Sequence, residues 1–173
     1  MAETSWPKPL RLSELAHGTV SRRVHADAAA LQRIAAELGL DGLDRLEAEA
    51  EVSPWLDGAR VRGRLRALVR QTCGVTLDPL ESQIDQDFEV SLLPVGSPNA
   101  PAAPEDSVID PDAEDPPELI EGDEIDLGAL VVEQLALEID PFPRKPGAVF
   151  DAGPEESPPS PFAVLKDFKP RGP

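Results

Sequence analysis

The chain has 173 residues and a formal net charge of −17 at pH 7, from 33 acidic and 16 basic side chains. The single cysteine, Cys73, excludes an intramolecular disulfide framework and a multi-cysteine zinc site. The first residues contain no apolar run, so we expect no secretory signal, and no stretch approaches the roughly 18 apolar residues of a membrane span. A uniformly acidic chain would also repel nucleic acid.

The charge is not uniform along the chain. Residues 1–100 carry 11 basic and 15 acidic side chains, whereas residues 101–173 carry 5 and 18, and sixteen of the 20 prolines lie at or after Pro94. Such a composition cannot bury enough apolar surface to offset the entropy of ordering. We therefore expect residues 94–120 to be a disordered, acidic, proline-rich linker, whose simplest role is that of a solvated spacer.

The first hundred residues are patterned like a folded domain. Residues 19–25 are typical of a short strand, and Asp27 is placed to cap a following helix. That helix has one apolar face and ends near Gly39. The face is formed by Leu31, Ile34, Ala35 and Leu38.

Two alternating runs then predict a hairpin. In residues 45–52 apolar side chains alternate with mostly acidic ones, and in residues 60–70 they alternate with arginines. The pair Asp57-Gly58 between them favours a two-residue turn, which would place Leu56 opposite Ala59. In that register Glu51 faces Arg64 and Glu49 faces Arg66.

A third alternating run completes a predicted antiparallel meander with one apolar face, which the helix would cover. Its apolar side chains are Leu80, Ile84, Phe88, Val90 and Leu92, and its polar ones are Glu81, Gln83, Asp85, Asp87 and Glu89. The predicted fold class is α+β, with a sheet-and-helix core over residues 1–93.

One more helix is expected within residues 121–140, with Asp126 as its N-cap. It is apolar nearly all round, so it should dock, and its own sheet is the nearest candidate surface. Its main apolar face comprises Leu127, Leu130, Val131 and Leu135. Residues 141–173 form a proline- and phenylalanine-rich tail containing Phe142, Phe150, Phe162 and Phe168.

An arginine stripe is the one basic patch of the chain and the obvious candidate for binding phosphate or a partner. It consists of Arg60, Arg62, Arg64, Arg66 and Arg70. The alternative is a solvated ladder in which neighbouring carboxylates neutralise the guanidinium groups. Arg60, Arg62 and Arg70 have no glutamate opposite them in the predicted register, so they are the stronger candidates for external contacts.

Other candidate sites are weaker. Cys73 is more typical of a small residue at a strand end than of a nucleophile, and His17 and His25 lack a carboxylate cluster that would complete a metal site. No glycine-rich phosphate loop, nucleophile elbow or His-Glu-x-x-His motif occurs. We therefore expect no enzyme, no cofactor and no metal.

The end of the tail combines apolar and basic residues, as in Pro161–Leu165 followed by Lys166, Phe168, Lys169 and Arg171. Such a segment either docks on a protein or RNA surface or packs back onto its own sheet.

Several blocks together resemble the YceD family, the large ribosomal RNA subunit accumulation proteins, in its alphaproteobacterial branch. They are residues 72–80, 84–90, 123–137 and 140–147, with Pro161–Leu165 in addition. Many members carry a Cys-x-x-Cys motif near position 73 and a cysteine-rich end. This chain has only Cys73, so no metal is transferred from the resemblance.

The resemblance implies a bacterial, cytoplasmic, non-enzymatic factor that supports 23S ribosomal RNA accumulation during large-subunit assembly. Its partners would be precursor ribosomal RNA or ribosomal proteins, with no membrane and no DNA. On physical grounds the contact candidates are Arg60, Arg62, Arg70, Arg144 and Lys145. Two alternatives are an acidic adaptor or chaperone for basic ribosomal proteins without RNA contact, and a magnesium-dependent nuclease that uses clustered carboxylates.

Overall fold

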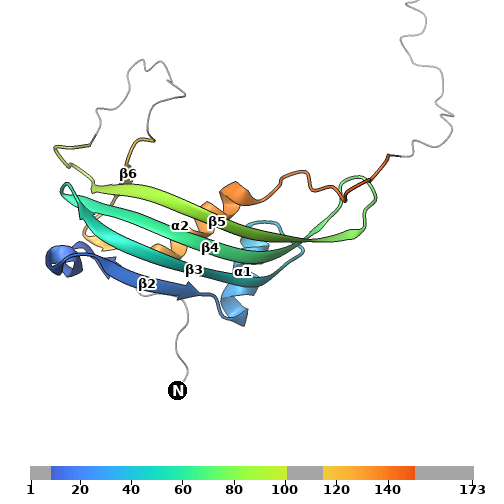
Figure 1. Ribbon diagram of the computed structural model, residues 1–173, viewed down its shortest axis with the longest axis horizontal. Coiled ribbons are helices and arrows are strands. Elements are labelled where there is room, and N and C mark those ends of the chain that lie inside the picture. Colours follow the sequence, from blue (N-terminus) through green and yellow to red (C-terminus); the bar gives the residue numbers. More distant parts are fainter. Residues whose placement is uncertain (1–8, 101–114, 151–173) are drawn as a thin grey trace, which may run out of the picture.

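A five-stranded sheet organises the molecule (Figure 1). The computed structural model describes residues 9–100 and 115–150. The strands, in order across the sheet, are β2 (Val20–His25), β3 (Gly42–Trp55), β4 (Gly58–Thr72), β5 (Pro79–Pro94) and β6 (Glu118–Ile120). Neighbours from β2 to β5 are antiparallel, which confirms the predicted meander, and β6 pairs in parallel with the end of β5.

One face of this sheet is the core of the domain. Alternating side chains of β3 and β4 are almost completely buried on it, including Leu46, Val52, Val61, Leu65 and Val69. Helices α1 (Ala28–Glu37) and α2 (Leu127–Glu138) lie on the same side of the sheet (Figure 1) and contribute buried residues to the same cluster. The period of two in the strands therefore separates an apolar inner face from a charged outer face.

Both helices begin where the sequence predicts. The Asp27 carboxylate accepts a hydrogen bond from the Ala30 N–H at 2.8 Å, and Gly39, just beyond α1, adopts a φ of +65°. Asp126 accepts from the N–H groups of Gly128 and Ala129 at 2.9 and 3.0 Å. These side chains satisfy amide donors that have no partner within the first turn.

Helix α2 docks on the sheet of its own chain. Its predicted face is buried, with Leu127, Leu130, Val131 and Leu135 all 5% exposed or less. Leu137, on another side of the helix, is 76% exposed. The docking follows from the apolar surface of the helix, which is too large to leave in water.

A second, two-stranded sheet was not predicted. Strand β1 (Leu10–Arg11) pairs with β7 (Glu124–Ile125), directly before α2. Leu10 and Ile125 are both buried, and a 3₁₀ helix, η1 (Leu12–His17), follows β1. This pairing joins the beginning of the described chain to the start of α2.

The predicted register of the β3–β4 hairpin is wrong. The turn residues are Leu56 and Asp57, and Trp55 pairs with Gly58, so Glu51 lies opposite Arg62, and Glu49 opposite Arg64. Gly58 is needed inside β4, because a Cβ there would lie 2.0 Å from the Leu92 carbonyl oxygen. Leu56 instead takes the positive φ, at +53°, that a tight hairpin turn requires.

The predicted linker lies partly outside the described residues, since residues 101–114 are not described. Its last residues were assigned wrongly to disorder, because Glu118–Ile120 form β6 beside β5. The Val95 N–H donates to the Ile120 carbonyl oxygen at 2.9 Å, which extends this contact by one residue.

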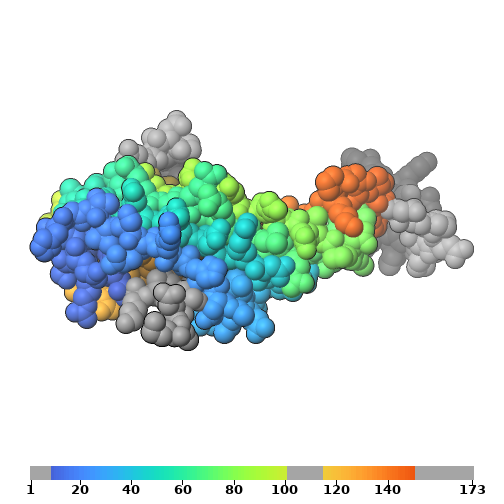
Figure 2. All heavy atoms as spheres, turned by 60° about the horizontal axis from the view of Figure 1, so that its bottom comes forward, coloured from blue at the N-terminus to red at the C-terminus, as the bar shows by residue number. Residues whose placement is uncertain are grey.

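The far end of the β4–β5 hairpin projects as an arm, accompanied by the segment that follows α2 (Figure 2). Pro143 accepts a hydrogen bond from the Gly74 N–H at 2.9 Å, and the Asp140 carbonyl accepts from Gln71 Nε2 at 3.0 Å. None of the helices in the described part of the chain is long and apolar enough to cross a membrane.

Candidate functional site

The outer face of the sheet carries columns of charge that alternate in sign from strand to strand. Acidic side chains of β3 lie next to arginines of β4, which lie next to acidic side chains of β5. The three cross-strand rows are Glu47–Arg66–Asp85, Glu49–Arg64–Asp87 and Glu51–Arg62–Glu89. Arg23 of β2 extends the middle row opposite Glu49.

The arginines of this stripe are ion-paired along its length. Arg62 Nε lies 2.8 Å from Glu89 Oε2, and Arg60 Nε lies 3.4 Å from Glu89 Oε1. Asp85 accepts from Arg64 and lies 3.5 Å from the Nε of Arg66. Opposite charges at neighbouring strand positions attract one another and lower the net field of the face.

The same pairs shift the pKa values of the carboxyl groups. Hydrogen bonding from Arg64 holds the pKa of Asp85 below its ordinary value, and hydrogen bonding from Arg62 does the same for Glu89. Both carboxylates therefore stay ionised to lower pH and keep the arginines neutralised.

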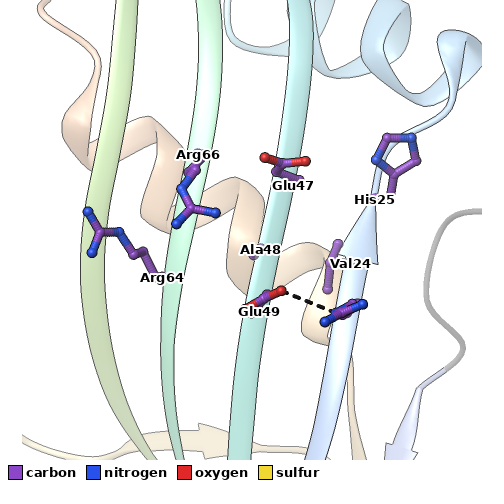
Figure 3. A pocket seen from close by; sticks show the side chains of 8 residues that line it. Val24, His25, Glu47, Ala48, Glu49, Arg64 and Arg66 are labelled. Atoms are coloured by element: carbon purple, nitrogen blue, oxygen red, sulfur yellow. Dashed lines mark ion pairs between the residues drawn. The ribbon is translucent and has the colours of Figure 1, made fainter.

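The strands form a shallow hollow on this face (Figure 3). It has a volume of about 290 Å³ and lies over β2, β3 and β4, between Arg23, His25, Glu47, Arg64 and Arg66. Arg23 pairs with Glu49 across it, at 3.2 Å. Its walls carry both signs of charge, so it has no uniformly positive surface for a phosphate.

The three predicted contact residues of β4 all have carboxylate partners. The prediction that no glutamate of the hairpin lies opposite these arginines is wrong for Arg62, because Glu51 of β3 lies opposite it, and it is confirmed for Arg70, which lies opposite Gly42. On the other side of β4, strand β5 places Glu89 opposite Arg62 and Glu81 opposite Arg70. The error at Arg62 follows from the shifted hairpin register.

Two of these arginines make further contacts outside the central rows. Arg70 pairs with Asp44 of β3, at 3.0 Å. Arg60 lies between two serines in register and packs over the Trp55 ring at 4.8 Å from its centroid. Cation–π packing and the pair with Glu89 hold this side chain against the sheet.

Arg144 and Lys145 lie in the segment after α2, which runs beside the arm, and not beside the arginine stripe. Lys145 Nζ pairs with Asp78 Oδ2 at 3.1 Å, while Arg144 is exposed and has no ion-pair partner among the described residues. The structure thus separates the five predicted contact residues into two groups.

Cys73 joins the arm to the segment after α2. Its buried Sγ lies 3.3 Å from the Lys145 backbone N and 3.5 Å from that of Thr76. Hydrogen bonds from the Thr76 side chain and from these backbone groups lower the pKa of the thiol to about 6. Cys73 therefore has a packing and hydrogen-bonding role that its position in the sequence did not reveal.

Two of the four tail phenylalanines lie in the described part of the chain. Phe142 and Phe150 are 77% and 74% exposed, whereas Phe162 and Phe168 lie outside the described residues. The described residues contain no cluster of three or more His, Cys, Asp or Glu side chains arranged to hold a metal ion.

The sequence profile of one family matches residues 61–169, well over half of the chain, and is described as Large ribosomal RNA subunit accumulation protein YceD. The chain belongs to the YceD family. Searches of curated proteins and of solved structures found no match. The YceD match covers β4 from Val61 onward, then β5, β6, β7 and α2, and it continues beyond the arm, whereas β2, α1 and β3 precede it.

Two of the blocks that suggested the YceD family meet in space. Residues 72–80 and 140–147 contact one another on the arm through the bonds from Gly74 to Pro143 and from Lys145 to Cys73 and Asp78. The resemblance thus includes a tertiary contact that links the β4–β5 hairpin to the chain after α2.

Proposed function

We propose that this protein is a non-enzymatic factor that supports 23S ribosomal RNA accumulation and the assembly of the large ribosomal subunit. Membership of the YceD family carries the proposal, because the family is described by large ribosomal RNA subunit accumulation. The protein would act by binding precursor particles.

The charge of the outer face favours binding to the basic proteins of those particles over binding to their RNA. The central rows of the outer face contain six carboxylates, and the three of β5 pair with the arginines of β4. A phosphate that approached this face would meet carboxylates on both sides of the arginine column, and it would have to displace them. A basic ribosomal protein would meet a favourable field instead.

This observation supports the second candidate function, an acidic adaptor or chaperone for basic ribosomal proteins without direct RNA contact. In that case, neutralising the carboxylates within residues 105–126 would abolish binding. Replacing Arg60, Arg62 and Arg70 with alanine would leave it unchanged. Direct RNA binding predicts the opposite pattern, together with a steep loss of affinity as salt rises.

The experiment for the main proposal is depletion of the protein in the cells that encode it. The expected result is a lower ratio of 23S to 16S ribosomal RNA and an accumulation of large-subunit precursors in sucrose gradients. The tagged full-length protein should co-sediment with those precursors. An unchanged rRNA ratio together with no co-sedimentation at low salt would refute the proposal.

The nuclease alternative has its own test. Purified protein incubated with precursor rRNA and magnesium should leave the RNA intact if the factor is non-enzymatic. Metal-dependent cleavage that co-purifies with the protein and is lost in carboxylate variants would favour the enzyme.

A further inference from the structure

Strand β5 has a long free edge. It runs over Pro79–Pro94, but β6 pairs only with Leu92, Leu93 and Pro94. Within residues 9–100 and 115–150, no strand pairs with the remaining part of β5 on that side. An unpaired strand edge is a template for the addition of another strand.

The direction of the backbone groups follows from one hydrogen bond. The Val95 N–H points toward β6, because it donates to the Ile120 carbonyl oxygen. Backbone groups alternate from side to side along a strand, and β5 pairs with β4 without a register shift. The odd-numbered residues from Glu81 to Ser91 therefore direct their N–H and C=O groups to the free edge.

The charge columns of the sheet indicate what the edge would accept. The columns are basic at Arg23 in β2, acidic in β3, basic in β4 and acidic in β5. A strand added beside β5 would continue the alternation of sign if its outward side chains were basic. Strand β5 is the last long strand of the sheet, so no such column is present beside it among the described residues. Strand β5 itself contains no lysine or arginine, and its inner face carries the half-buried Ile84 and, within the core, Phe88 and Val90. A strand that alternates basic and apolar side chains would match both faces.

A groove marks the end of this edge beside β6. It has a volume of about 760 Å³, and its lining includes three carboxylates, from Glu89, Asp115 and Glu118, and the exposed Leu137. Arg60 and Arg62 also line it, and both pair with Glu89. Burial and the nearby Glu133 raise the pKa of Glu118. A cation that entered the groove would stabilise that carboxylate, and an aliphatic stem would cover Leu137.

We propose that the free edge of β5 binds an extended segment of a basic protein as an added β-strand, in which lysine or arginine alternates with apolar residues. This inference rests on the proposed function and names the class of partner that it needs. RNA is disfavoured by the carboxylates of β5, and a second copy of the chain would place acidic side chains opposite acidic ones if β5 paired with β5. The chain's own tail lacks the alternation, because Lys166 and Phe168 would point to the same side of a strand.

The first experiment measures binding of a labelled peptide in which Lys and Val alternate to the full-length protein. Gln83 directs its N–H to the edge, so Gln83→Pro removes an edge donor and leaves the β4 ladder intact. We expect the dissociation constant to rise about tenfold with Gln83→Pro and to stay within about twofold with Gln83→Ala. Equal affinity of a correctly folded Gln83→Pro and Gln83→Ala would overturn strand addition.

A second measurement does not depend on the folding of any variant. The same peptide carrying N-methyl groups at alternate residues loses the donors that strand pairing needs, so binding by the unaltered protein should fall by about tenfold or more. A matched peptide of alternating Glu and Val should not bind. Undiminished binding of the methylated peptide, or equal binding of the acidic one, would contradict the proposal.

Hydrogen exchange identifies the occupant. On addition of the Lys-Val peptide, the amides of Gln83, Asp85, Asp87 and Glu89 should become protected. If these amides are already protected without the peptide, and the protection is lost when residues 151–173 are removed, the tail is the occupant and the proposal is wrong. If single-stranded oligouridylate protects the same amides and the peptide does not, the edge binds RNA and the proposal is wrong.

Co-sedimentation with large-subunit precursors separates this inference from the function it rests on. If the Gln83→Ala protein co-sediments and the Gln83→Pro protein does not, both stand. If both variants co-sediment equally, the edge is not the contact, while the proposed function stands. Failure of the unaltered protein to co-sediment would remove the proposed function itself.

Discussion

At the scale of single residues, glycine and cysteine have structural roles that their sequence context does not reveal. Gly58 is predicted in the turn but is the first residue of β4, where its backbone approaches Leu92. Cys73 was expected to be a small strand-end residue, and it is also a hydrogen-bond acceptor for a segment 72 residues away. Both roles depend on neighbours that are distant in the sequence.

Replacing Gly58 with alanine should lower the free energy of unfolding by at least about 1–3 kcal/mol. The reason is the backbone carbonyl of Leu92, which lies 2.0 Å from the position of the added Cβ and belongs to a paired strand that cannot move freely. Urea denaturation measures the change. Gly74→Ala is the control, because its nearest neighbour would be Pro143 O at 3.8 Å, and it should change stability by about 0.5 kcal/mol or less.

Cys73 should make the stability of the protein depend on pH. The thiol pKa is about 6 in the folded chain against an ordinary value of 9.0, so the stabilising contribution is complete above pH 9 and is lost as the pH falls through 6. The difference in unfolding free energy between the unaltered protein and Cys73→Ala should therefore grow between these values and be flat below them. Urea titrations at several pH values measure it, and a difference that does not vary with pH would contradict the lowered pKa.

At the scale of elements, the helices follow local rules and the strand pairs do not. Both N-caps and the apolar faces of α1 and α2 were predicted correctly because they depend on residues within one or two turns. The β3–β4 register was predicted wrongly, since it depends on where Gly58 fits against β5. The short strands β1, β6 and β7 have too few residues for a periodic pattern to reveal them.

The cap of α2 provides the test at this scale. Asp126→Ala should lower the free energy of unfolding by about 0.5–2 kcal/mol, because two N–H groups of the first turn lose their acceptor. Asp126→Asn keeps an oxygen acceptor and should retain most of the stability. Thermal or urea unfolding monitored by circular dichroism compares the variants, and equal losses in both would show that the charge rather than the acceptor matters.

At the scale of the whole molecule, the part of the chain that matches the YceD family contains only part of the hydrophobic core. The match begins at Val61, inside the β3–β4 hairpin, and so leaves out β2, α1 and β3. Buried residues from those elements, among them Ile34, Leu46 and Val52, belong to the same core as Val61 and Leu65.

A fragment of residues 61–173 should therefore be unfolded. Without β3, the inner face of β4 and the buried side of α2 would be exposed to water, and one edge of β4 would lose its partner. Its nuclear magnetic resonance spectrum should show poorly dispersed amide signals, and its urea denaturation curve should show no cooperative transition. A chain of residues 1–150 is the control, since it keeps every contact described here, and it should unfold cooperatively. A folded 61–173 fragment would contradict this prediction, because it would show that β4, β5 and α2 form a stable core without β2, α1 and β3.

The sequence by itself determined the α+β class, the three long alternating strands, both capped helices and the separation of an apolar face from a charged one. Each of these depends on periodicity or on contacts within a few residues. Only the tertiary structure decided the register of the hairpin and the carboxylates that pair with Arg62 and Arg70, which are Glu89 and Asp44. It also placed Lys145 beside Cys73 and, within residues 9–100 and 115–150, left the edge of β5 before Leu92 without a strand partner. These features depend on side-chain size and backbone approach between segments far apart in the chain, which a local pattern does not encode.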